Sequence, residues 1–102
     1  MIHDDQNTKT SLDLAQIRED IDSVDQQIQQ LINRRAKLAE AVAKAKFASE
    51  ENPMFYRPER EAQVLRNVMQ RNEGPLSDVT MARLFREIMS ACLALEAPQS
   101  VA

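Results

Sequence analysis

The sequence predicts an all-α protein with three helices per chain, the first of them very long. Apolar residues recur at alternating three- and four-residue spacing over most of the first half of the chain, which is the pattern of a helical seam. The four prolines and the single glycine stand at positions 53, 58, 74–75 and 98, which divides the chain into three helical segments. A chain of 102 residues fits one domain of about the commonest size.

The first helix is expected over residues 13–49. Asp13, with Gln16 three positions later, resembles a capping box. The seam that follows has one interruption, at Arg35, and no Gly or Pro stops it before Pro53. Its apolar positions are Leu14, Ile17, Ile21, Val24, Ile28, Leu31, Leu38, Val42 and Ala45. Residues 1–12 are polar and are expected to form a flexible tail.

Pro58 suits the first position of the second helix, because a missing N–H costs nothing there. Glu59 and Glu61 favour the same start through the helix dipole, and Gly74-Pro75 ends the segment. Its apolar face consists of Val64, Leu65, Val68 and Met69.

The third helix is expected to be capped by Ser77 or Asp78 and closed by Ala97-Pro98. Its apolar stripe consists of Met81, Leu84, Phe85, Ile88, Met89, Cys92, Leu93 and Leu95. The domain is therefore expected over residues 13–97, with 98–102 as a C-terminal tail or linker stub.

The first helix is too long for a compact monomer. At 1.5 Å per residue it would be roughly 50 Å long, whereas a globule of this size has a diameter of about 33 Å. Its acidic residues crowd the first half and its basic residues the second, so two antiparallel copies could pair. We predict an intertwined homodimer.

Composition excludes several classes of function. With one glycine the chain has no Gly-rich phosphate loop, and with one Cys and one His it has no closed zinc site and no internal disulfide. A net charge of −3 and 4% aromatic residues argue against nucleic-acid binding. There is no apolar run of membrane-spanning length and no secretory signal, so we expect a cytoplasmic protein without metal or cofactor.

Three cations of the first helix do not fit a simple bundle. Arg35 is at a seam position, and Lys46, eleven residues later, lies only about 20° away around the helix. A register-setting Arg35 and a snorkelling Lys46 are about as plausible as an anion site. Arg18 points about 100° away from Arg35. It either pairs with Asp22 on the surface or reaches into a second protomer.

Further candidate site residues belong to the other two helices. Glu96 continues the apolar stripe and stands at a helix C-terminus, and both features raise a carboxyl pKa unless the last turn is frayed. Arg57 and Glu61 can pair at the start of the second helix, where Arg60 is an unexpected cation. Cys92 is typical of a small core residue. This set suits a small dianion and chemistry that needs only positioning and electrostatics.

The ordered set of local motifs resembles the all-helical class of chorismate mutase. Within that class it is most similar to the N-terminal mutase domain of the bifunctional chorismate mutase–prephenate dehydratase, the P-protein. The likeness covers about residues 12–97 and is specific only as an ordered set. The motifs are Ile17–Asp25, Leu31–Ala39, Lys44–Lys46, Phe55–Glu61 and Arg83–Met89.

The resemblance implies an interlocked dimer that isomerises chorismate to prephenate without a cofactor, in phenylalanine and tyrosine biosynthesis. It implies that Arg18 from the opposite protomer and Arg35 each clamp one substrate carboxylate. Lys46 would bond the ether oxygen, where negative charge develops. Glu61 would accept from the ring hydroxyl, and Arg60 would form part of the wall.

Three positions depart from the family pattern. Many relatives have Gln where Glu96 stands, so Glu96 is expected to be protonated in the active complex. Cys92 occupies a position where the best-known relative has Ser, and Arg57 replaces an acid of that relative. Arg57 and Cys92 are nevertheless included among the candidate substrate-binding residues.

Two alternatives stay open. Isochorismate-pyruvate lyase has the same fold and shares the cations, although Glu61 favours the mutase. A non-catalytic helical dimerisation module would explain the seam but not Arg35 and Lys46. The sequence also leaves open whether the chain is a monofunctional enzyme or one domain of a longer one.

Overall fold

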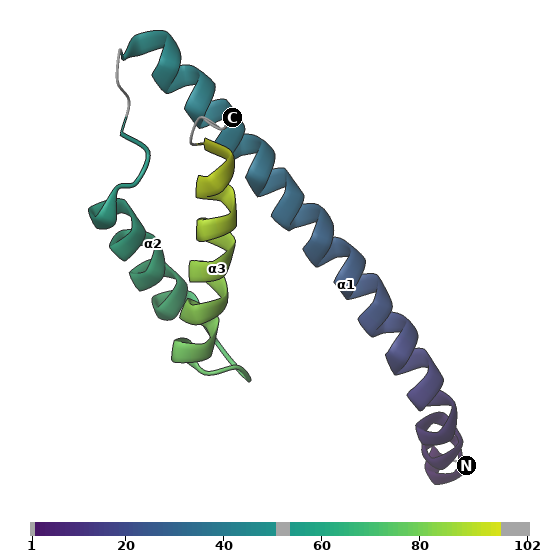
Figure 1. Ribbon diagram of the computed structural model, residues 1–102. Helices are drawn as coiled ribbons and strands as arrows, with labels where there is room; N and C mark the ends of the chain where they lie inside the picture. Colours follow the sequence, from purple (N-terminus) through teal and green to yellow (C-terminus); the bar gives the residue numbers. More distant parts are fainter. Residues whose placement is uncertain (1, 51–53, 97–102) are drawn as a thin grey trace. The chain divides into compact units, whose positions relative to one another are not determined.

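The computed structural model describes residues 2–50 and 54–96, with side chains from residue 13 onward (Figure 1). Three helices make up nearly all of this part: α1 (Ile2–Ser49), α2 (Pro58–Arg71) and α3 (Asp78–Glu96). No strand occurs among the described residues, so the predicted all-α class and the three helices are confirmed. The predicted stub at 98–102 lies outside the described residues.

Helix α1 begins at Ile2, and the predicted start at Asp13 is wrong. Residues 2–12 contain neither Gly nor Pro, and extending an existing helix costs far less than nucleating one. The amide of Gln16 therefore does not cap the helix but donates to Asp20 Oδ1 (3.0 Å). The predicted end is confirmed at Ser49, whose hydroxyl donates to the carbonyl of Ala45 (3.1 Å).

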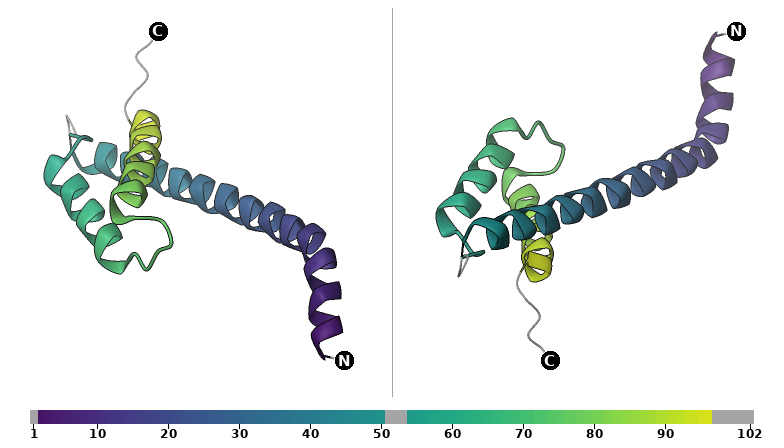
Figure 2. Two further views of the ribbon diagram at one scale, coloured as in Figure 1. Left: turned by 90° about the horizontal axis from the view of Figure 1, so that it is seen from below. Right: turned by 90° about the horizontal axis from the view of Figure 1, so that it is seen from above.

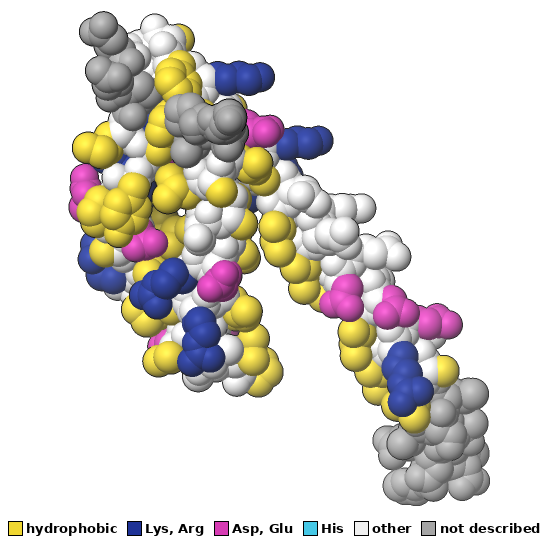
Figure 3. Space-filling view, viewed as in Figure 1, with side chains coloured by type: hydrophobic (Ala, Val, Ile, Leu, Met, Phe, Trp, Pro, Cys, Tyr) yellow, Lys and Arg dark blue, Asp and Glu magenta, His cyan; other side chains and the backbone are white. Residues whose placement is uncertain are grey.

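The chain divides into two compact units, residues 1–33 and 34–102. In the first unit, α1 carries a row of large apolar side chains along one side (Figure 3). All are between 48% and 61% exposed: Leu14, Ile17, Ile21, Val24, Ile28 and Leu31. A single helix cannot bury its own apolar face, so this row needs a partner surface. We call it the apolar row of α1.

The second unit consists of the C-terminal part of α1 together with α2 and α3. Within it, α2 and α3 pack side by side (Figure 2). Its buried residues are Ala39, Ala43, Leu65, Val68, Ala82 and Cys92. Three of these six are alanines, and small side chains let helix backbones approach closely. The core of this unit is therefore thin, and large side chains remain at its edges.

Local signals at the ends of α2 and α3 agree with the sequence. Pro58 occupies the first turn of α2, as predicted. The hydroxyl of Ser77 caps α3 by accepting from the backbone N–H of Thr80 (3.1 Å). The amide of Asn72 donates to the Leu76 carbonyl and to Asp78 Oδ1, both at 2.8 Å, and so ties the connection to α3.

The glycine of this connection, Gly74, has φ of +79°, a left-handed conformation that other residues rarely adopt. Among the described residues, no helix is long and apolar enough to cross a membrane.

Candidate active site

The second unit contains a cavity of about 500 Å³. This volume is in the range of small-molecule sites. Residues of α1, of the segment before α2, and of α2 and α3 line it: Arg35, Leu38, Ala39, Val42, Lys46, Phe55, Tyr56, Arg57, Arg60, Glu61, Val64, Met89, Ser90, Leu93 and Glu96. The structure therefore brings together six of the eight candidate residues of the sequence.

One face of α1 supplies a wall of the cavity. Arg35, Ala39, Val42 and Lys46 follow one another at three- or four-residue spacing, which places their side chains on the same side of the helix. Arg35 and Lys46 are both half-buried. In the described part of the chain, Arg35 has neither an ion pair nor a hydrogen-bond partner for its side chain. A half-buried guanidinium that makes no ion pair is suited to hold a ligand anion.

The ammonium of Lys46 is held by two groups of the segment that precedes α2. Its Nζ donates to the backbone carbonyl of Met54 (2.6 Å) and lies 5.3 Å from the centre of the Phe55 ring. An ammonium has three N–H donors, so two remain for a ligand.

The start of α2 contributes Arg57, Arg60 and Glu61. Arg57 Nε lies 3.4 Å from Glu59 Oε2, with both side chains exposed, and not from Glu61, with which the sequence allowed a pairing. The backbone N–H of Glu61 bonds to the Arg57 carbonyl in the first helical turn (3.0 Å). Arg60 donates to Gln63 Oε1 at 3.4 Å. Such exposed contacts are weak, so both arginines remain available to an anion.

Helix α3 places Glu96 in the cavity and Cys92 in the core. Burial raises the pKa of Glu96 above its ordinary value, although the charges of Lys46 and Arg35 act in the opposite direction. The direction agrees with the sequence prediction. Cys92 is 3% exposed and does not line the cavity. Its burial follows from its place on the apolar stripe of α3.

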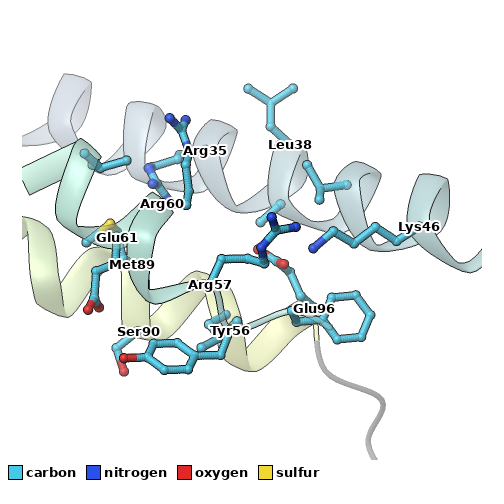
Figure 4. A pocket seen from close by; sticks show the side chains of 15 residues that line it. Arg35, Leu38, Lys46, Tyr56, Arg57, Arg60, Glu61, Met89, Ser90 and Glu96 are labelled. Atoms are coloured by element: carbon cyan, nitrogen blue, oxygen red, sulfur yellow. The ribbon is translucent and has the colours of Figure 1, made fainter. Parts of the chain in front are cut away.

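The charged side chains gather in two groups (Figure 4). Arg35 and Arg60 lie together at one end, while Lys46, Arg57 and Glu96 converge at the other. The lining holds four cationic and two acidic side chains, so it favours an anion of more than one charge.

Arg18, the remaining candidate, belongs to the first unit and does not line this cavity. Its side chain is exposed, and no ion pair joins it to Asp22 within the described part of α1. The surface pairing considered from the sequence is therefore not present in this chain.

Sequence reasoning did not place Phe55, Tyr56 or Ser90 in the site. Tyr56 and Ser90 both line the cavity (Figure 4). The signal for Ser90 was weak: Ser90 and Leu93, and likewise Leu93 and Glu96, lie about 60° apart around α3, but Ser90 and Glu96 lie about 120° apart. The two aromatic residues had no such signal, since they belong to a segment without helical periodicity.

The geometry defines a class of protein: an all-helical domain with a pocket lined by four cationic side chains. Within the described residues, no group of three His, Cys, Asp or Glu side chains could hold a metal ion. What the pocket offers a ligand is therefore a set of positioned charges and hydrogen-bond donors.

Comparison with known proteins identifies the family. The sequence pattern of chorismate mutase type II matches residues 17–97. The bifunctional chorismate mutase/prephenate dehydratase of Stutzerimonas stutzeri is 55% identical over 92 residues, covering 87% of this chain and 25% of that protein. The corresponding protein of Pseudomonas aeruginosa is 53% identical over 92 residues, with the same shares of both chains covered.

A solved structure agrees. The chorismate mutase (form II) of Thermus thermophilus superposes with a TM-score of 0.78 at 30% identity, covering 84% of this chain and 96% of that one. The chain belongs to the chorismate mutase type II family. It spans about a quarter of the length of the curated relatives that it matches.

Proposed function

We propose that this chain isomerises chorismate to prephenate by a [3,3] rearrangement, a step in the biosynthesis of phenylalanine and tyrosine. The observation that carries the proposal is the cavity of a chorismate mutase family member, with Arg35 and Arg60 at one end and Lys46 and Glu96 at the other. Chorismate has two carboxylates and an ether oxygen between its ring and its enolpyruvyl arm. The cavity offers a cation or a donor for each kind of group.

The rearrangement breaks the C–O bond and forms a C–C bond within one molecule, so it needs no external acid, base or nucleophile. The enzyme accelerates it by holding the enolpyruvyl arm over the ring and by stabilising the polar transition state. Arg35 clamps one carboxylate, because a guanidinium binds a carboxylate through two parallel hydrogen bonds. Arg57 and Arg60 add positive charge to the wall, and Glu61 accepts from the ring hydroxyl.

Lys46 and Glu96 act on the ether oxygen. Negative charge develops there as the C–O bond breaks, and a donor placed at that atom stabilises the transition state more than the ground state. Lys46 supplies a charged donor. Glu96 supplies a second donor only when it is protonated, and the burial that raises its pKa supports this role.

The site is completed by a second copy of the chain. The apolar row of α1 is about half exposed, and an intertwined homodimer would cover it. In that dimer Arg18 enters the site of the opposite protomer and binds the second carboxylate. An Arg18 side chain that is exposed and without an ion pair in the described chain supports this assignment.

The proposal assigns the mutase domain to residues 13–97, close to the 17–97 matched by the family. It also includes a cytoplasmic location. Cys92, buried beneath the cavity lining, then acts by packing rather than by a polar contact with substrate.

The test is to add the purified chain to chorismate and to identify the product by proton NMR. Prephenate is the expected product. If chorismate is left unchanged, isochorismate is the next substrate, and formation of salicylate and pyruvate would replace the mutase with the lyase. If neither compound reacts and a dianionic transition-state analogue does not raise the melting temperature, the chain is a binding module without this site.

A further inference from the structure

We propose that Phe55 is a positioning residue for Lys46: its ring, together with the Met54 carbonyl, holds the ammonium at the cavity. The inference rests on the proposed function, because it concerns the donor to the ether oxygen. It adds a role for the segment between α1 and α2.

Lys46 needs such a restraint. It stands in the last turn of α1, and its side chain has four flexible bonds, so many positions of the ammonium compete with the one at the cavity. Left alone, an ammonium at a helix end turns toward water. A donor that acts on a developing charge must instead be in place before the reaction.

Two contacts of different kinds provide the restraint. The Met54 carbonyl accepts from Nζ at 2.6 Å, which fixes one N–H. The Phe55 ring lies 5.3 Å from Nζ, within the distance at which the negative face of an aromatic ring attracts a cation. Neither partner carries a charge, so neither neutralises the ammonium, and two donors stay available to the substrate.

The ring of Phe55 is itself held in place. Its centre lies 5.4 Å from that of Phe47, at an angle of 52° between the ring planes. Phe47 directly follows Lys46 in α1, so the two aromatic residues join the end of this helix to the segment before α2. The contact between the two rings thereby holds Phe55 close to Lys46.

The test compares Phe55→Leu, which keeps an apolar side chain of similar size, with Phe55→Tyr, which keeps the ring. We expect Phe55→Leu to lower kcat/KM about three- to tenfold, mainly through kcat, because a cation–π contact of this exposure has about that worth. Phe55→Tyr should retain most of the wild-type kcat/KM. Val79→Ala is the control, since it shortens an exposed apolar side chain that does not line the cavity.

A double-mutant cycle separates positioning from packing. In a Lys46→Met background, Phe55→Leu should have no further effect on kcat/KM. An equal loss in both backgrounds would overturn the inference and leave Phe55 as a packing residue only.

Proton NMR tests the contact without turnover. The Lys46 ε-methylene protons should be shifted upfield by the Phe55 ring, and the shift should vanish in Phe55→Leu and persist in Phe55→Tyr. An unshifted methylene in the wild-type chain would refute the contact. Absence of prephenate with the shift intact would instead count against the proposed function alone.

Discussion

Lys46 and Glu96 approach one cavity from the last turns of two different helices, α1 and α3, and the ends of their side chains converge (Figure 4). The charge of Lys46 opposes the effect of burial on the pKa of Glu96, yet burial prevails. The Lys46 ammonium thus stands beside a carboxyl group whose pKa is raised.

Glu96 should make activity depend on pH. Because ionised Glu96 has no proton to donate, activity should fall as pH rises through its raised pKa, by an amount on the order of 10- to 1,000-fold if one transition-state hydrogen bond is lost. Glu96→Gln should abolish this fall, because an amide donates at every pH. The measurement is the pH profile of kcat for both proteins. If kcat of Glu96→Gln still falls at high pH as in wild type, Glu96 is not the proton donor.

The same group affects stability. Since the folded chain has the higher pKa, Glu96 favours folding below its ordinary value of 4.5, and this contribution is lost as pH rises through the raised value. Wild type should therefore lose stability relative to Glu96→Gln over that pH window. Urea unfolding at several pH values measures the free energy of unfolding of both proteins. If this free energy changes with pH equally in wild type and Glu96→Gln, the prediction is contradicted.

Lys46→Ala should lower kcat by about 100- to 1,000-fold, because a charged donor at the ether oxygen is lost. The fold should change little, since the ammonium lies at the cavity and not in the core. Lys44→Ala is the control, as Lys44 is exposed on the same helix and does not line the cavity. Steady-state kinetics measures kcat of both variants. A comparable loss of kcat in Lys44→Ala and Lys46→Ala would indicate a general effect of charge instead.

Arg18 and Arg35 test the shared site. Each single change to Ala should nearly abolish activity, and mixing the two inactive variants should restore about a quarter of the wild-type rate, because half of the dimers would have one complete site. Arg34→Ala, at an exposed position outside the cavity lining, should remain active. Mixed dimers without activity, after subunit exchange has been demonstrated by mass spectrometry, would exclude the contribution of Arg18 from the opposite protomer.

The apolar row of α1 should govern assembly. Ile21→Asp places a charge in the proposed interface and should raise the dimer dissociation constant by about 100-fold or more. Ser23→Asp adds the same charge nearly opposite on the helix and should leave the constant unchanged. Sedimentation velocity over a concentration series distinguishes the two, and an unaffected Ile21→Asp dimer would place the interface elsewhere.

The ends of the helices could be predicted wherever one residue type has a local reason for its position. Pro58 has no N–H to satisfy and a suitable φ, and Ser77 offers an oxygen to Thr80, so both were predictable. The start of α1 was not, because residues 2–12 have no strong breaker and a continuing helix needs no cap at Asp13.

The sequence by itself determined the helical class, the family resemblance and the unusual charges at Arg35, Lys46 and Glu96. Spacing along one helix is enough to place Arg35 and Lys46 on one face, since every residue adds a constant rotation. Which groups from separate helices meet is a matter of packing. Only the tertiary structure therefore showed that Lys46 contacts Met54 and Phe55, that Arg57 turns to Glu59, and that Cys92 is buried while Glu96 reaches the cavity.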